Sequence, residues 1–195
     1  LEKETALKMA EKLFHNEKIE IREYNKRYYP EDIVGSHIIG YIKAIDDKDW
    51  EVLSKDPAKK RTDFIGKRGI EKNYDKILKG VDGEEIVEVD ARGNVKGIVE
   101  RRDSVAGENI YLSIDLDLQK YMTEEFAGKK GAFIAMEAKT GKIIAAVSFP
   151  EYSPNFMGSR FSSEEWKMLV EDPNEPLNNK FSGSAYPPGS TFKVV

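Results

Sequence analysis

Residues 132–148 read AFIAMEAKTGKIIAAVS, two apolar runs on either side of a short polar segment. The polar segment, Ala138 to Gly141, has the composition of a tight turn, so the stretch predicts a β-hairpin. Both runs are mostly apolar and do not alternate, so we expect strands that are covered on both faces. This hairpin predicts a buried sheet in the second half of the chain.

Helical patterns lie on both sides of this hairpin. Asp115-Leu116-Asp117 predicts a helix start after an expected strand at 110–114, with both aspartates placed to cap the helix and complement its dipole. Ser162 to Trp166 has the cap-then-acid signature of another helix, which we expect to run to about Glu171. Separate helices and hairpins without βαβ alternation indicate an α+β fold.

The N-terminal part of the chain shows the same mixture. Apolar spacing predicts an amphipathic helix over 2–16, a short helix over 30–40 and a further helix over 70–80. Residues 46–65 are polar and interrupted by proline, which predicts a loop. Apolar runs on both sides of a glycine–asparagine turn predict a second hairpin over 86–99.

A polar, glycine-containing stretch, residues 101–108, separates two regions of ordered pattern. We therefore place a domain boundary there, with one domain over 1–104 and the other over 105–195. Both domains are expected to be truncated. The chain starts at Leu1 without a signal peptide or initiator methionine, and it stops at Val195 inside a helix that has just begun.

Composition excludes several classes of function. The 195 residues are 39% hydrophobic and 34% charged, as in a folded chain. A net charge of -4, without a basic patch interleaved with aromatic residues, argues against a nucleic-acid partner. With no cysteine and two histidines, His15 and His37, we expect no disulfide, metal site or cofactor, and we assign the histidines no catalytic role. No apolar run is long enough for a membrane helix.

The chemistry of the chain is expected at Ser190-Thr191-Phe192-Lys193. Residues three apart at a helix start emerge on one face, so the Lys193 amine can reach the Ser190 hydroxyl. A lysine kept neutral by its surroundings can take the hydroxyl proton, and the helix N-terminus favours the negative charge that develops. Ser-x-x-Lys fixes only two residues, however, and a capping serine beside an exposed lysine remains the alternative.

A family resemblance supports the catalytic interpretation. Residues 186–193, Tyr-Pro-Pro-Gly-Ser-Thr-Phe-Lys, resemble the active-serine motif of class B penicillin-binding proteins. Upstream segments match the same family in the same order: Arg27 to Pro30, His37 to Tyr41, Gly69 to Glu71, Ile114 to Gln119 and Thr140 to Ile143. Asp172 to Leu177 is most similar to the elongation type, the penicillin-binding protein 2 group.

The resemblance implies a peptidoglycan D,D-transpeptidase that cross-links stem peptides during cell elongation. It makes Ser190 the nucleophile that attacks the D-Ala-D-Ala end and Lys193 the general base, with β-lactam antibiotics as mimics of that dipeptide. It also implies an N-terminal pedestal (dimerisation-type) domain over 1–104 and the start of the transpeptidase domain over 105–195. Because further family motifs follow the serine, the fragment alone is expected to be inactive.

The resemblance also implies a location and partners. The parent would be anchored in the cell membrane by a single segment missing from this chain, with its functional domains on the extracytoplasmic (periplasmic) side. Besides the stem peptide and β-lactams, the implied partners are a membrane glycosyltransferase and shape-complex proteins, which would bind through the pedestal.

Several other residues resemble later motifs of the family, metal ligands or a catalytic acid. Ser153-Pro154-Asn155 and Lys139-Thr140-Gly141 resemble later motifs of the family but precede the serine, and their proline and glycine predict turns. Asp115 and Asp117 are better explained as caps than as metal ligands. Glu71 is expected to bond to backbone at a helix start and not to act as an acid.

Two other functions stay open. Class D β-lactamases and β-lactam sensor domains also carry Ser-Thr-Phe-Lys, although they lack a pedestal of about a hundred residues. The fragment would otherwise act only as a protein-interaction module.

Overall fold

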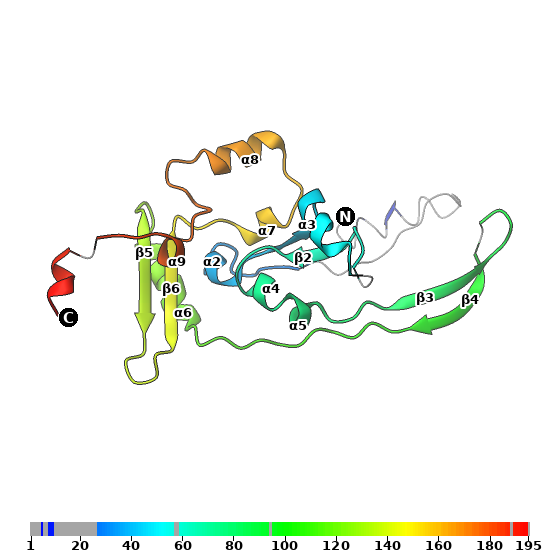
Figure 1. The fold of residues 1–195 in the computed structure, drawn as a ribbon, viewed down its shortest axis with the longest axis horizontal. Helices are drawn as coiled ribbons and strands as arrows, with labels where there is room; N and C mark the ends of the chain where they lie inside the picture. Colours follow the sequence, from blue (N-terminus) through cyan, green and yellow to red (C-terminus); the bar gives the residue numbers. More distant parts are fainter. Residues whose placement is uncertain are drawn as a thin grey trace.

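The computed structural model describes residues 5, 8, 9, 27–56, 59–93, 95–187 and 189–194. Figure 1 shows the β3–β4 hairpin reaching out at one end of the molecule and the β5–β6 hairpin near the other, with short helices and β1–β2 between them. The sheets of the described part are three antiparallel pairs of strands. This mixture of helices and antiparallel hairpins confirms the α+β class.

The described elements follow one another without βαβ units. The N-terminal part contains α2 (Ser36–Ile39), β1 (Ile42–Ala44), α3 (Asp47–Leu53), β2 (Phe64–Gly66), α4 (Gly69–Asn73), α5 (Asp75–Lys79), β3 (Glu84–Val89) and β4 (Val95–Arg102). The C-terminal part contains α6 (Leu116–Glu125), β5 (Gly131–Met136), β6 (Ile143–Phe149), α7 (Pro154–Met157), α8 (Ser163–Val170), α9 (Lys180–Gly183) and the 3₁₀ helix η1 (Gly189–Val194).

The elements with strong local signals are confirmed. Both hairpins form, with Val87 opposite Ile98 in one and Phe133 opposite Val147 in the other. Asp115 caps α6, since its Oδ1 accepts a hydrogen bond from the Leu118 amide at 3.0 Å. At α8, Ser162 and Glu165 form the predicted capping box, in which each side chain accepts from the other residue's backbone amide. Local capping chemistry therefore fixes where these helices begin.

The burial of the β5–β6 hairpin differs from the prediction. Residues 145–148 of β6 are buried, but alternate side chains of β5, such as Ile134 and Met136, are exposed. Helix α6 packs against β6, and α9 packs against both strands. Complete coverage was therefore predicted correctly for β6 and wrongly for β5, because among the described residues one face of β5 has no covering element.

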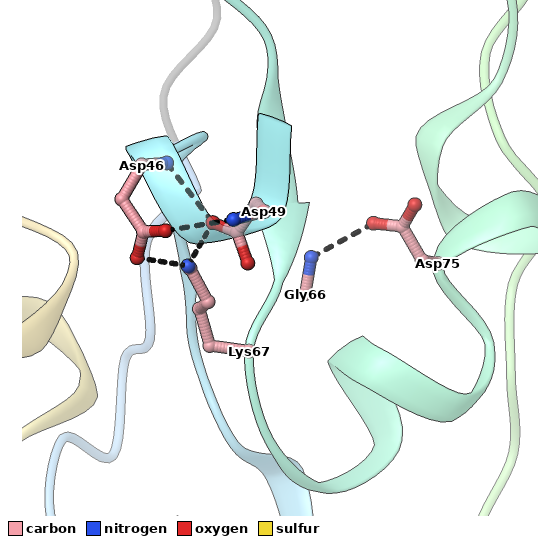
Figure 2. A network of polar contacts seen from close by, with 5 residues as sticks. All are labelled: Asp46, Asp49, Gly66, Lys67 and Asp75. Carbon is pink, nitrogen blue, oxygen red and sulfur yellow. Dashed lines mark hydrogen bonds and ion pairs between the residues drawn. The ribbon is translucent and has the colours of Figure 1, made fainter. Parts of the chain in front are cut away.

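The loop predicted over 46–65 is wrong. This segment contains α3 and the start of β2, which pairs with β1. Figure 2 shows the cause: Asp46 and Asp49 accept hydrogen bonds from each other's backbone amide, at 2.9 Å in both directions. The Gly66 amide donates to Asp75 Oδ1 at 2.9 Å, which ties β2 to α5. An acidic capping box in a polar stretch thus starts a helix that we took for loop.

Other boundaries also moved. The helix expected from residue 30 begins at Ser36, because Asp32 (φ 44°) and Gly35 (φ 71°) adopt left-handed backbone that an α-helix cannot contain. The helix expected over 70–80 is divided into α4 and α5 at Tyr74 and ends, as predicted, at a positive-φ glycine.

Four further expectations concern a strand, the two ends of the chain and the domain boundary. The strand expected at 110–114 is absent, and this segment is joined to β6 by a side-chain bond from Ser113 Oγ to Ile143 O at 2.6 Å. Most of the helix expected over 2–16, including His15, lies outside the described residues. The helix expected around Ser190 is of the 3₁₀ type. Strand β4 extends to Arg102, and the domain boundary in 101–108 stays a prediction.

A small aromatic core lies where the two parts of the chain meet. Tyr29 and Tyr41 from the N-terminal part pack with Tyr152 and Met157 from the C-terminal part. The His37 ring is buried edge-on against Tyr152, at 4.9 Å between centroids. The two parts therefore share one core. In the part of the chain that the structure describes, no helix has the length and apolar content to cross a bilayer.

Candidate functional site

The serine and lysine predicted to carry the chemistry lie together on η1. Ser190 and Lys193 are both exposed, and residues three apart in a 3₁₀ helix lie on the same side of it. Gly189 enters the helix with φ 57°, a conformation that favours glycine. In Figure 1 this segment, in red, extends beyond the β5–β6 hairpin. The structure thus presents a hydroxyl and an amine on one turn, open to solvent.

The described residues do not enclose this pair. No hydrogen bond or ion pair joins the side chain of Ser190 or Lys193 to another described residue. Acyl transfer requires a second proton carrier and donors aimed at the developing oxyanion, in a site from which water is excluded. What the described residues supply is one component of such a site.

The segment before the serine is fastened to the sheet. The Lys180 amide donates to Ser148 Oγ on β6 at 2.9 Å, and that hydroxyl donates to Asn178 O at 3.1 Å. The Lys180 side chain is 1% exposed and donates to Glu175 O at 2.8 Å. Burial lowers the pKa of this amine. We did not predict this contact, because lysine is rarely buried and no local pattern indicates it.

A buried carboxylate, Glu151, joins three segments. Its Oε1 accepts from the Gly35 amide at 3.0 Å, and its Oε2 accepts from Thr123 Oγ1 on α6 at 3.1 Å. Burial raises the pKa of Glu151 to about 7. The glutamate therefore connects the entry of α2 with α6 across the two parts of the chain. Nothing in its sequence neighbourhood predicted this role.

Ser153-Pro154-Asn155 forms a second polar contact between the two parts. Ser153 caps α7 and donates from Oγ to Asp32 Oδ1 at 2.5 Å. The Asn155 amide group donates to Tyr29 O at 2.8 Å and to Asp32 at 2.9 Å, and it accepts from the Tyr29 amide at 3.1 Å. We expected a turn here, and the structure gives a short helix whose first residues hold the N-terminal part in place. We call Tyr29, Asp32, Glu151, Ser153 and Asn155 the polar junction.

The second segment that resembles a later family motif is part of a turn, as predicted. Lys139-Thr140-Gly141 lies between β5 and β6, with Gly141 at φ 73°. Thr140 Oγ1 bonds to the Glu137 carboxylate and accepts from the Lys142 amide at 3.2 Å. These contacts belong to the hairpin turn, so the string needs no functional explanation.

The backbone contact predicted for Glu71 is wrong. Its buried carboxylate pairs with Arg27 Nε at 2.9 Å and accepts from the Tyr29 hydroxyl at 3.2 Å. That hydroxyl in turn accepts from the Ile42 amide at 3.1 Å. Burial raises the pKa of Glu71 and the Arg27 guanidinium opposes this. Glu71 points inward because the 27–30 segment offers it two side-chain donors. The described residues contain no group of three potential metal ligands.

Comparison with known proteins identifies the family. The model described as "Penicillin-binding Protein dimerisation domain" matches residues 1–112, more than half of the chain. The chain belongs to the penicillin-binding protein family. The model for the penicillin binding protein transpeptidase domain matches residues 131–195, which include Ser190 and Lys193. The expected order of a pedestal followed by the start of a transpeptidase domain is therefore confirmed.

Individual relatives place the chain near the elongation type of penicillin-binding protein. It is 40% identical over 178 residues to the peptidoglycan D,D-transpeptidase MrdA of Escherichia coli strain K12, covering 90% of this chain and 28% of that protein. It is 41% identical over 178 residues to MrdA of Haemophilus influenzae, covering 90% and 27%. The chain thus spans a little over a quarter of these relatives.

Solved structures agree. The complex between penicillin-binding protein PBP2 and MreC from Helicobacter pylori matches with a TM-score of 0.82 at 33% identity, over 98% of this chain and 35% of that chain. Pseudomonas aeruginosa PBP2 in complex with WCK 5153 matches with a TM-score of 0.70 at 32% identity, over 88% of this chain and 34% of that chain. The resemblance to the penicillin-binding protein 2 group is confirmed.

Proposed function

We propose that this chain is the pedestal and active-serine segment of a peptidoglycan D,D-transpeptidase that acts in cell elongation. Ser190 is its nucleophile and Lys193 its general base. The observation that carries the proposal is the placement of these two residues on one side of η1, inside the region that the transpeptidase model matches. The relatives named as D,D-transpeptidases support the reaction class.

In the proposed reaction, Ser190 Oγ attacks the carbonyl of the penultimate D-Ala of a stem peptide. The hydroxyl proton passes to the neutral Lys193 amine, the peptide C–N bond breaks, and the terminal D-Ala leaves with that proton on its amine. An amine of a neighbouring stem peptide then attacks the acyl ester, forming the cross-link and releasing Ser190. A β-lactam follows the first step and leaves an acyl-serine. No cofactor enters this scheme.

The pedestal gives the proposal a second aspect. A relative of this chain was solved as a complex with MreC. We place the parent on the extracytoplasmic (periplasmic) side of a membrane to which it is anchored, with the pedestal binding shape-complex proteins and a membrane glycosyltransferase. The long exposed β3–β4 hairpin leaves surface of the pedestal accessible for such contacts.

The comparisons argue against the β-lactamase or sensor alternative but not against an interaction role. The match of the dimerisation model to residues 1–112 argues against a class D β-lactamase or a β-lactam sensor domain. An interaction role is favoured for the 195-residue chain by itself, because no described side chain encloses Ser190. Pull-down with the 195-residue chain and its Ser190→Ala variant separates this role from catalysis, since binding that survives the loss of the serine needs no acyl transfer.

The base is tested in the full-length parent with Lys193→Ala. We expect the variant to fold normally and to be acylated by penicillin at least about a hundredfold more slowly, because the serine has lost its proton acceptor. Lys139→Ala, which removes an exposed lysine from the hairpin turn, is the matched control and should leave the rate unchanged. Rapid acylation of Lys193→Ala would assign the base to another residue.

A further inference from the structure

A cavity away from η1 lies between the N-terminal part and the α7–α8 region. It has a volume of about 450 Å³. Its walls include Tyr41 and Lys43, immediately before and within β1, on one side and Met157, Phe161 and Trp166 on the other. Figure 1 shows α8 on an arm of the chain that loops away from α7. Tyr41 and Met157 belong both to the aromatic core and to the walls of this cavity.

Phe161 and Trp166 line the cavity and belong to a group of three stacked aromatic rings, of which the third, Phe156, lies outside the lining. Phe156 and Phe161 lie with centroids 5.2 Å apart and planes 15° from parallel, and Phe161 and Trp166 lie 5.7 Å apart and 10° from parallel. Trp166 ends the stack and is 41% exposed. A large ring held rigidly by stacking and open on its outer side is the kind of anchor that concentrates binding energy at protein interfaces.

The charges of the cavity are unevenly compensated. Figure 2 shows that Lys67 is paired with both Asp46, at 2.9 Å, and Asp49. Lys43 lies with its amine 3.6 Å from the centroid of Phe161, and no carboxylate among the described residues is within ion-pair distance of it. The other oxygen of Asp46 accepts from the Asp49 amide. Lys43 is therefore the cation of this cavity that makes no ion pair with a described residue.

Burial and the neighbouring Lys67 lower the pKa of Lys43, and the Asp46 carboxylate opposes this shift. An arriving carboxylate would favour the charged form of this amine, so anion binding and protonation would support each other. The Coulomb attraction between an amine and a carboxylate is stronger in a partly desolvated site than in water. The cavity thus combines an apolar ring surface with one lysine that makes no ion pair with a described residue.

We propose that this cavity is a docking site for a segment of a partner protein that places an aromatic or large apolar side chain on Trp166 and a neighbouring carboxylate on Lys43. Charge complementarity at Lys43 and the exposed end of the aromatic stack together define this occupant. The bound segment would bridge β1 and α8 and so hold the α8 arm against the N-terminal part. The proposal does not depend on acyl transfer at Ser190.

The probe is the capped peptide acetyl-Gly-Phe-Glu-Gly-amide, with its glutamine analogue as the neutral control. Each is titrated into the isotope-labelled chain while the NMR signals of the Trp166 indole N–H and the Lys43 amide are followed. We expect saturating shifts of both signals and at least about tenfold tighter binding of the glutamate peptide. Phenylpropanoate, a free small acid with the same ring and charge, is the third ligand and should bind more weakly than the peptide.

Variants assign the two contacts. Lys43→Met keeps the apolar stem and should abolish the difference between the glutamate and glutamine peptides, and Trp166→Ala should weaken both. Lys139→Met removes a distant exposed lysine and should change nothing. Equal binding of the two peptides to the unaltered chain, or shifts centred outside the cavity, would overturn the proposal. Phenylpropanoate binding as tightly as the peptide would overturn the protein partner and indicate a small-molecule anion site.

Discussion

The polar junction and the active-serine segment are opposites in their contacts. At the junction, Asn155 alone makes three hydrogen bonds to Tyr29 and Asp32, and Glu151 is buried between two parts of the chain. On η1, Ser190 and Lys193 are exposed and bond to no described side chain. The difference teaches that the described residues use their long-range polar contacts to join the two parts of the chain and not to fix the proposed nucleophile and base.

The largest expected effect on stability is at the junction. Asn155→Ala removes three hydrogen bonds and leaves the Tyr29 amide without its acceptor, while Tyr29 O and Asp32 Oδ1 each keep one other donor, so it should lower the free energy of unfolding by about 3 kcal/mol. Asn174→Ala, at an exposed asparagine in a turn, is the control and should cost less than about 0.5 kcal/mol. Urea unfolding measures both. Equal midpoints for the two variants would mean that the junction does not hold the parts together.

The next expected effect is a pH dependence of stability that arises from Glu151 in the polar junction. The pKa of Glu151 is raised from its usual 4.5 to about 7, so between these values the folded chain holds a proton that the unfolded chain releases. Its contribution to stability is full below pH 4.5 and is lost as pH rises through about 7. Glu151→Gln should therefore gain stability relative to the unaltered chain, by up to about 3 kcal/mol, between about pH 5 and about pH 8.

His37 works in the opposite direction in the same core. Burial lowers its pKa from 6.5 to about 4, so its contribution is present above pH 6.5 and is lost as pH falls through about 4. Between pH 4.5 and 6.5, the contribution of Glu151 to stability falls with pH while that of His37 rises. Urea midpoints across this range should therefore rise with pH in Glu151→Gln and change less in the unaltered chain. A parallel pH profile for both proteins would exclude Glu151 as the titrating group.

The smallest stability effect is expected on η1. Ser190→Ala and Lys193→Ala remove exposed side chains without described partners, so each should change the free energy of unfolding by less than about 0.5 kcal/mol. Measured beside Asn155→Ala, they complete the comparison between the two regions. A loss of more than about 1 kcal/mol in either variant would show that η1 is packed more firmly than its exposure indicates.

Much of the secondary structure could be predicted because its signals are local. The hairpin over 132–148, the cap at Asp115 and the capping box at Ser162 each depend on residues close in sequence, and all are confirmed. Helix α3 was not predicted although its signal, the capping box of Asp46 and Asp49, is equally local, because aspartates in a polar stretch are also typical of loops. The assignment of Ser190 and Lys193 as nucleophile and base comes from their own sequence and its family resemblance, and it stays a prediction.

The contacts that join the two parts of the chain could not be predicted from local sequence signals. Tyr29 and Asn155 are separated by 126 positions, and Gly35 and Glu151 by 116. No periodicity in a single sequence indicates which distant polar groups will meet in a core. The inward orientation of Glu71 and the burial of Lys180 follow from the same long-range packing, which overrides the usual preference of charged residues for the surface.

The central claim, that Ser190 is the acylated residue, is tested most directly by penicillin labelling with intact-mass analysis and peptide mapping. In the full-length parent we predict one penicilloyl adduct, on the peptide that contains Ser190, and no adduct in Ser190→Ala. In the 195-residue chain we predict no adduct, because no described group encloses the serine. An adduct on another residue of the parent, or labelling of Ser190→Ala, would contradict the account.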